Sequence, residues 1–292
     1  MKWFFVFLVI IMIIVVWGFV ENHIFVVHTY KVKDSKIPKS FHNARIMYLA
    51  DYHNTSYGKD NKRLKKAIKR CRPDYVMIGG DLLSKPDRNF VAAFDLLSYL
   101  SQHYPVYFAN GNHETKMKQY PKHYHNNYPD FMQMAKTLPV TFLNNKKCSI
   151  VRPGEHGEER IYLHGLELGL DYFIRSRQKA LTIKSLENYL GKCQEKGYHI
   201  LLAHSPNFYE IYDEWGADLV LSGHNHGGMA RIPFVGGVLS TEAKLFPRYS
   251  KGVYKGKNGR MIVSAGLGSH TIKIRYFNPP ELLMITLDAS DS

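Results

Sequence analysis

Five short apolar runs recur along this chain, and each one ends in a small cluster of polar residues. The runs read IMYLA, YVMI, VYFA, ILLA and DLVLS. Short β-rich runs that are bounded by Gly, Asp or Asn predict buried strands. If these strands are parallel, their carboxyl ends lie along one edge of an open sheet, where such sheets build their sites. The polar clusters expected at that edge are Asp51-Tyr52-His53, Gly80-Asp81, Gly111-Asn112-His113-Glu114, Ala203-His204-Ser205 and Gly223-His224-Asn225-His226.

Other stretches alternate with these runs and predict helices or an edge strand. Residues 59–72 (KDNKRLKKAIKRCR) place Leu64 and Ile68 at helical spacing and leave the basic residues on the outer face. Residues 24–32 (IFVVHTYKV) alternate loosely, which predicts a strand at a sheet edge. Strands that alternate with helical segments, followed by a strand-rich C-terminal part, predict a single α/β domain.

An uncharged apolar run of 18 residues extends from Trp3 to Val20. A helix that spans a bilayer needs about 20 apolar residues, with a range of roughly 17–25. Trp3 and Trp17 stand near the two ends of the run, where aromatic rings favour the membrane interface. No A-x-A-like cleavage site follows, so an uncleaved anchor is favoured over a cleaved signal peptide. The expected division is a membrane anchor over residues 1–22 and one folded domain over residues 23–292.

Basic residues are in excess in this chain. Lysine and arginine outnumber aspartate and glutamate by 39 to 25, which gives a formal net charge of +14 at pH 7. Such an excess attracts anionic phospholipid headgroups, nucleic acid or anionic substrates, although many of the bases could simply solvate helix faces. The three cysteines, Cys71, Cys148 and Cys193, lie far apart without a CxxC pair. This spacing argues against a disulfide framework and against a thiolate metal site.

The polar clusters combine carboxylates, an amide and imidazoles, which suit metals such as Mn, Fe and Zn. The ordered series DxH, GD, GNHE, H and GHxH, within a stretch from about Arg45 to about Leu287, resembles the calcineurin-like metallophosphoesterases. Residues 218–233, Gly266-Leu267-Gly268 and Asn278-Pro279-Pro280-Glu281 resemble the membrane-anchored or exported bacterial branch of that family. The resemblance implies an α/β fold, a four-layer α-β-β-α sandwich of two mixed sheets, with two divalent metal ions bound at one end.

The resemblance also implies a role for each motif position. The implied metal ligands are Asp51, His53 and His226 for the first ion, Asp81 as the bridge, and Asn112, His204 and His224 for the second ion. Two bridged ions about 3.5–4 Å apart lower the pKa of a shared water and produce the attacking hydroxide. His113 resembles the non-ligand histidine that protonates the leaving group or stabilises charge on the phosphoryl group. If residues 224–226 are extended, both of their imidazoles project the same way and each can reach one ion.

Several residues near the motifs admit two interpretations. His164 ends another apolar run and is expected to be a structural or outer histidine, whereas His270, after strand MIVSA, is a candidate for the edge of the site. Residues 116–128 (KMKQYPKHYHNNY), which include His123 and His125, form either a surface loop or helix, or a cap that recognises the non-phosphate part of the substrate.

Position 52 departs from the family pattern, because a small aliphatic residue is more common there. The Tyr52 side chain is expected to point away from the metals and into the fold. The sequence identifies no substrate-binding residue.

The ligand set predicts a dimetal phosphoesterase that acts on phosphodiester or pyrophosphate bonds rather than on simple monoesters. Together with the anchor and the basic charge, it suggests that the partners are the lipid bilayer and a phosphate ester, lipid-linked or from the cell envelope. A nuclease or nucleotide phosphodiesterase is the alternative enzyme, although no dedicated nucleic-acid module is evident. A third hypothesis is a non-catalytic, membrane-tethered scaffold of the same fold.

Charge around the apolar run bears on which side of the cell membrane the domain occupies. Only Lys2 precedes the run, whereas Lys31, Lys33, Lys36 and Lys39 follow it, so the positive-inside rule taken literally places the domain in the cytoplasm. These lysines begin about ten residues beyond the run, where the rule weakens. The family resemblance favours the extracytoplasmic side. We therefore expect a single-pass membrane protein and leave its side open, with the extracytoplasmic side slightly favoured.

Overall fold

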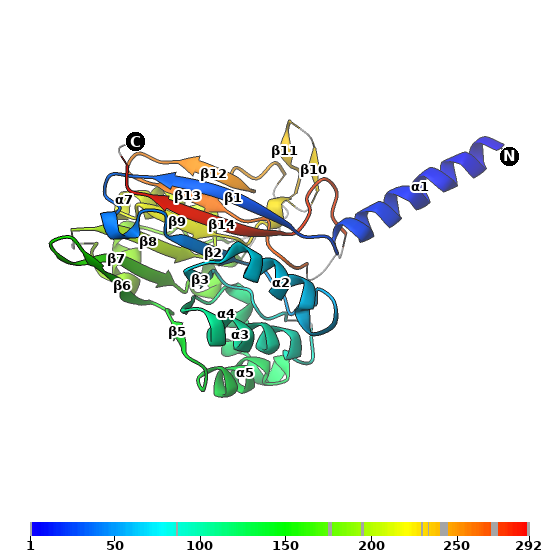
Figure 1. Ribbon diagram of the computed structural model, residues 1–292. Coiled ribbons are helices and arrows are strands. Elements are labelled where there is room, and N and C mark those ends of the chain that lie inside the picture. Colours follow the sequence, from blue (N-terminus) through cyan, green and yellow to red (C-terminus); the bar gives the residue numbers. More distant parts are fainter. Residues whose placement is uncertain are drawn as a thin grey trace.

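One long apolar helix, α1 (Lys2–Glu21), projects from the folded body (Figure 1). The computed structural model describes residues 2–85, 87–174, 177–193, 196–228, 230–232, 234–239, 245–269 and 274–290; His270 lies outside these ranges. Most side chains of α1 are exposed. Within the described ranges, α1 is the one helix that is long and apolar enough to cross a membrane.

A first mixed sheet of six strands carries three of the five motif runs. Its strands lie in the order β1 (Val26–Lys33), β14 (Glu281–Asp288), β2 (Arg45–Leu49), β3 (Tyr75–Ile78), β4 (Val106–Phe108) and β5 (Val140–Phe142). β14 and β2 are antiparallel, and all other neighbours are parallel. The edge position of β1 confirms the prediction from the loose alternation of residues 24–32.

A second mixed sheet of six strands carries the other two motif runs, on β8 and β9. Its strands lie in the order β12 (Gly252–Lys255), β13 (Arg260–Val263), β9 (Leu219–Ser222), β8 (Tyr198–Ala203), β7 (Gly157–Leu166) and β6 (Lys146–Gly154). The pairs at the two edges of this sheet, β12 with β13 and β7 with β6, are antiparallel, and all other neighbouring strands are parallel. The five motif strands do not lie along the edge of one open sheet: they are divided between two sheets, as the family resemblance implied, and the carboxyl ends of these strands meet at one end of the sandwich.

Helices cover the outer face of each sheet. The first sheet is covered by α2 (Lys62–Cys71), α3 (Val91–His103), α4 (Asn112–Gln119) and α5 (Asn127–Ala135), and the second by α6 (Ile183–Leu190) and α7 (Tyr209–Trp215). One apolar cluster lies between the two sheets, and one further cluster lies between each sheet and its own helices. This order of layers confirms the predicted four-layer α-β-β-α sandwich.

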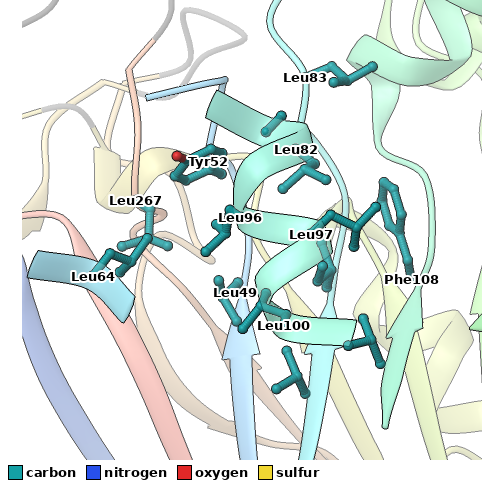
Figure 2. Packing of buried hydrophobic residues seen from close by; sticks show 14 of the residues in the cluster. Leu49, Tyr52, Leu64, Leu82, Leu83, Leu96, Leu97, Leu100, Phe108 and Leu267 are labelled. Carbon is teal, nitrogen blue, oxygen red and sulfur yellow. The ribbon is translucent and has the colours of Figure 1, made fainter. Parts of the chain in front are cut away.

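Helix α2 shows how the sequence pattern selects a buried face. Leu64 and Ile68, on the inner face of α2, are fully buried, and both belong to the same apolar cluster as Leu267 (Figure 2). Burying a leucine or isoleucine side chain contributes about 1.5–3 kcal/mol. The basic residues of α2 lie on its exposed face. The predicted amphipathic helix is therefore confirmed.

Candidate metal centre

The motif clusters lie in loops that leave the carboxyl ends of strands in both sheets. The first sheet provides Asp51 and His53 after β2, Asp81 after β3 and Asn112 at the start of α4, and the second provides His204 after β8 and His224 and His226 after β9. The structure brings these seven positions together at one end of the sandwich. Gly111 permits the approach of two of these loops, because a Cβ atom there would lie 2.3 Å from the Asp81 Oδ1 atom.

The side chains form two groups of potential metal donors. One group is Asp51, His53 and His226, and the other is Asp81, His204 and His224. Within each group the donor atoms lie within 4.8 Å of one another. Asp81 lies between the groups: its Oδ2 atom is 3.1 Å from Nε2 of His204 and 3.9 Å from Nε2 of His53. A carboxylate placed in this way can serve two neighbouring ions, as a two-metal site requires.

Three imidazoles are oriented by backbone carbonyl groups. The Nδ1 atom of His204 lies 2.8 Å from the carbonyl oxygen of Gly79. The Nδ1 atom of His53 lies 3.3 Å from the carbonyl oxygen of Leu83, and that of His226 lies 3.1 Å from the carbonyl oxygen of Gly268. A carbonyl oxygen can only accept, so each neutral ring carries its proton on Nδ1 and presents the Nε2 lone pair to the centre. This is the arrangement in which histidine binds a metal through Nε2.

His113 has the opposite arrangement. Its Nδ1 atom accepts a hydrogen bond of 3.2 Å from the backbone N–H of Lys85. The neutral ring therefore carries its proton on Nε2, which lies 3.9 Å from Oδ2 of Asp81. His113 also stands within 4.8 Å of donor atoms of His53 and Asp81, so distance alone does not separate it from the ligands. The position of its proton separates His113 from the ligands, because the Nε2–H group makes His113 a hydrogen-bond donor toward the site.

The backbone around the centre is in an uncommon conformation. Asp51, His53, Asp81, His224 and His226 all have positive φ angles, between 47° and 68°. Non-glycine residues adopt this left-handed region rarely, and such residues cluster at functional sites. The expectation that residues 224–226 are extended is wrong, because two of the three are left-handed and the chain turns there. The two imidazoles reach separate donor groups because the turn aims them, not because a strand alternates.

Divalent cations fit this donor set. Nε2 of His53 and Nε2 of His226 lie 3.2 Å apart. With both Nδ1 protons directed at carbonyl oxygens, two lone pairs face each other, and a shared cation would relieve their repulsion. In addition, the Asn112 Oδ1 atom is buried and has no hydrogen-bond partner in the described part of the chain. An unmatched buried polar atom costs about 1–3 kcal/mol, which a metal ligand bond would offset.

The proton affinities of the buried groups reflect crowding of charge. Burial opposes ionisation of Asp81, but the charges of His204 and His113 outweigh it and hold the Asp81 pKa well below its usual range. Burial alone would lower the pKa of His204, whereas Asp81 and Asp51 raise it to about 10. Burial raises the pKa of Asp51 to about 7. Protons on these groups supply part of the positive charge that bound cations would otherwise supply.

Glu114 supports the loops of the centre, although no sequence pattern was interpreted as assigning it a role. Its fully buried carboxylate accepts backbone N–H bonds from Asp81 (2.8 Å), Leu83 (2.8 Å) and Gly111 (2.9 Å). Burial and the charge of Asp81 raise the pKa of Glu114 to about 7. Glu114 thereby ties the loop after β3 to the start of α4. Its place three residues after Gly111, the glutamate position of a capping box, was a signal that could have identified it.

A buried arginine, Arg275, was also missed. It is 1% exposed and donates to the carbonyl oxygens of Gly268 (2.7 Å) and Ala265 (2.8 Å). Its guanidinium lies 3.5 Å from Nδ1 of His226, farther than the Gly268 oxygen that orients this ring. Arg275 therefore fixes the segment against which the His226 ring rests. No local pattern in the sequence indicates this role.

The end of α1 connects to the same segment. The Glu21 carboxylate accepts hydrogen bonds from the backbone N–H groups of Phe277, at 3.0 Å, and Asn278. The Asn278 side chain then donates to the backbone carbonyl of His226 at 2.6 Å. Glu21 and Asn278 therefore join the apolar helix to the turn over residues 224–228, here termed the metal-binding turn.

The remaining candidates lie apart from the two donor groups. His164 is buried, and its Nε2 atom lies 3.1 Å from Nδ1 of His199, which agrees with a structural role. His123 and His125 are exposed and belong to none of the donor groups found in the described ranges. Whether residues 116–128 act as a cap stays a prediction. Tyr52 points into the fold, as expected, and its hydroxyl donates to Asn61 at 2.8 Å (Figure 2).

Comparison with known proteins agrees with the geometry. A family model described as calcineurin-like phosphoesterase matches residues 44–228, a range that contains all seven predicted ligands and His113. The Bacillus subtilis (strain 168) metallophosphoesterase YkuE is 24% identical over 280 residues, which cover 94% of this chain and 89% of the relative. A Helicobacter pylori metallophosphoesterase is 29% identical over 265 residues, which cover 88% of this chain but 64% of the relative. The phosphodiesterase YaeI of Escherichia coli (strain K12) is 25% identical over 254 residues, with 83% and 82% covered.

Proposed function

Since this chain belongs to the calcineurin-like phosphoesterase family, we propose that it hydrolyses phosphodiester or pyrophosphate bonds while anchored to a membrane. Family membership makes it a metal-dependent phosphoric ester hydrolase that uses two divalent ions. The observation that carries the proposal is the place of Asp81 between two groups of imidazole donors. A phosphodiesterase among the relatives supports the preference for diesters.

The proposed ligands follow the two donor groups. The first ion would be held by Asp51, His53 and His226, the second by Asn112, His204 and His224, and both by Asp81. When bound, divalent ions of the Mn, Fe or Zn type supply Lewis-acid activation of water and of the phosphoryl oxygens. The chain supplies Nε2 lone pairs that backbone carbonyls hold in place, so the donors need little rearrangement to bind.

His113 is the proposed proton donor. Because the Lys85 N–H occupies its Nδ1 atom, the Nε2–H bond is directed toward the centre. From there it can donate to the leaving oxygen of the ester or to a charged phosphoryl oxygen. A positioned general acid typically contributes 10²–10⁴-fold to a rate.

The membrane proposal rests on α1. Its length and apolar composition suit a single span, and Glu21 joins its end to the metal-binding turn. A centre held next to a bilayer could reach phosphate esters at the membrane surface, so we propose a lipid-linked or cell-envelope phosphate as substrate. The resemblance of residues 218–233 to the membrane-anchored or exported bacterial branch of the family supports a proposed extracytoplasmic side.

A nucleic acid or nucleotide substrate is the second candidate, favoured by the net charge of +14. Binding driven by phosphate contacts falls steeply with salt. Strong, salt-sensitive binding of DNA together with a preference for soluble nucleotides would select this alternative over the lipid substrate.

The test uses the full-length protein, purified in detergent without chelator and loaded with Mn. Hydrolysis of bis(p-nitrophenyl) phosphate is followed beside p-nitrophenyl phosphate, with Asp81→Asn as the inactive control. We expect metal-dependent cleavage that favours the diester and is lost in the variant. Equal turnover of both esters would contradict the diester preference. Absence of turnover with Mn, Fe and Zn would count against a general phosphodiesterase.

A further inference from the structure

Six apolar side chains form an exposed surface, here termed the apolar ledge. Its members are Ile232, Phe234, Val235, Leu245, Phe246 and Phe277, each at least 47% exposed. Four of them line an open hollow of about 510 Å³ together with Arg231 and Gly236. Contiguous exposed apolar surface is uncommon on soluble proteins and marks a site of interaction with a protein, a ligand or a membrane.

The backbone of the ledge is strained as well. Phe234, Phe246 and Phe277 all have positive φ angles, of 69°, 48° and 51°. A bulky side chain in this region of φ is a conformational outlier that is unfavourable for the backbone. Three phenylalanines therefore hold an unfavourable backbone conformation and also expose their rings to water. Both costs would be offset if the rings were buried against an apolar partner.

The ledge is built directly onto the metal-binding turn. Its hairpin, β10 (Arg231–Ile232) and β11 (Gly236–Gly237), begins three residues after Gly228, the last residue of that turn. A Cβ atom at Gly228 would lie 2.5 Å from the Gly237 Cα atom, so the hairpin base and the turn are in close contact. Backbone hydrogen bonds from Val238 to Ala230 and from Phe246 to Val238, both 2.9 Å, join the segment that carries Leu245 and Phe246 to the hairpin.

The ledge also adjoins the exit of α1. Figure 1 shows the β10–β11 hairpin at the end of the body from which α1 projects. Phe277 donates its backbone N–H to Glu21, and Arg231 donates its backbone N–H to Tyr276 at 2.9 Å. A Cβ atom at Gly18 would lie 2.6 Å from the Tyr276 ring, so this segment packs on the last turns of α1. The exposed surface of α1 therefore continues onto the ledge.

This continuity indicates a lipid bilayer as the occupant. We propose that the apolar ledge inserts into the interfacial layer of the bilayer that α1 crosses, and that it holds the metal centre against the membrane surface. Exposed phenylalanines beside a basic side chain such as Arg231 are typical of surfaces that lie in the headgroup boundary. The inference rests on the proposed function, because it takes α1 to be embedded in the membrane.

The test places a fluorescent reporter on the ledge of the full-length protein. The three native cysteines are replaced by alanine, and one cysteine is introduced by Phe234→Cys or, at a position without a positive φ, by Val235→Cys. Ile11→Cys reports on α1, and Val253→Cys, exposed on β12, reports on a surface outside the ledge. Each variant is labelled with NBD and reconstituted in vesicles of phosphatidylcholine and phosphatidylglycerol that contain nitroxide-labelled lipid.

We expect lipid nitroxide to quench NBD at positions 234, 235 and 11, and to leave NBD at position 253 unquenched. Quenching at position 11 without quenching at 234 and 235 would overturn the ledge proposal while the anchor stands. Absence of quenching at positions 234, 235 and 11 alike would overturn both. A label on the ledge could instead be shielded from aqueous iodide, remain unquenched by lipid nitroxide, and lie where two copies of the chain cross-link. The ledge would then be an interface with a second copy, and the proposal would be wrong.

A functional measurement separates lipid contact from folding. Phe234→Asp replaces a fully exposed ring and should leave turnover of bis(p-nitrophenyl) phosphate unchanged. In the reconstituted vesicles, the ratio of quenched to unquenched label at position 235 should fall about tenfold, because loss of one buried phenyl group weakens insertion of the ledge. Val253→Asp is the matched control and should change neither reading. An unchanged quenching curve in Phe234→Asp would contradict the proposal.

Discussion

The Glu21 carboxylate at the end of α1 accepts a hydrogen bond from the backbone N–H of Asn278, and Asn278 in turn holds the carbonyl of His226. The apolar helix and the metal-binding turn are thus parts of one connected unit. A domain cut after residue 22 would lose this carboxylate, so activity is best measured on the full chain.

Glu21→Gln should weaken metal binding. The carboxylate accepts with both oxygens, from Phe277 and from Asn278, and an amide can accept with only one. Outer partners of metal ligands typically contribute 10–100-fold to affinity, so we expect a loss of about tenfold. Metal titration followed by activity measures it. Glu155→Gln, at an exposed glutamate, is the control, and equal affinity in both variants would show that the Asn278 segment does not need this contact.

Glu114→Gln should destabilise the fold and the centre together. Three backbone N–H groups converge on this buried carboxylate, and glutamine turns an NH₂ group toward some of them. Hydrogen bonds to charged groups contribute about 1.5–3 kcal/mol each, so we expect about 2 kcal/mol less free energy of unfolding. Urea denaturation measures the change. Glu158→Gln, whose side chain is 71% exposed, should stay within about 0.5 kcal/mol of the parent.

His113→Gln should separate catalysis from metal binding. Because Nε2 of His113 carries a proton, its loss should lower kcat by about 10²-fold or more while metal content is kept. Asp81→Asn should instead lose bound metal, since Asp81 lies between both donor groups. Elemental analysis beside steady-state rates distinguishes the two. Metal loss in His113→Gln equal to that in Asp81→Asn would make His113 a ligand.

Metal removal should reverse the pH dependence of stability. In the metal-free chain the pKa of His204 is raised from 6.5 to about 10 and that of Asp51 from 3.8 to about 7, so the folded state binds more protons than the unfolded state. Stability from His204 is complete below about pH 6.5 and is lost as the pH rises toward 10, and Asp51 adds a cost above about pH 4. The lowered pKa of Asp81 contributes stability that is constant above the usual pKa of an aspartate and is lost only as the pH falls below it, so Asp81 adds no slope between about pH 6 and about pH 9.

Cations compete with these protons, so metal-loaded protein should gain stability as the pH rises. Melting temperatures with chelator and with Mn, taken from about pH 6 to about pH 9, should diverge. The chelated protein should melt lower at high pH. Parallel curves would mean that the protons and the cations do not share these groups.

The sequence was sufficient to predict the layers of the fold and to name a candidate donor set, of which the structure gathers six side chains into two groups. Apolar runs that end in Asp, Asn or His are local patterns, and burial of Leu64 and Ile68 beneath α2 follows from helical spacing alone. Short-range patterns determine which residues begin a loop at a strand end. They do not determine which strands are neighbours, and for that reason the single sheet edge expected for the motifs proved to be two sheets.

By itself, the sequence determined which side chains could bind metals, because ligand chemistry depends on residue type and on position at the end of a run. Tertiary structure decided how they act. Left-handed backbone at Asp51 and His224 aims the donors, and carbonyl groups from other loops set the proton position on the imidazoles of His53, His204 and His226. Glu21 and Asn278 are 257 positions apart, and their contact exists only because the folded sheets bring both ends of the chain to the metal centre.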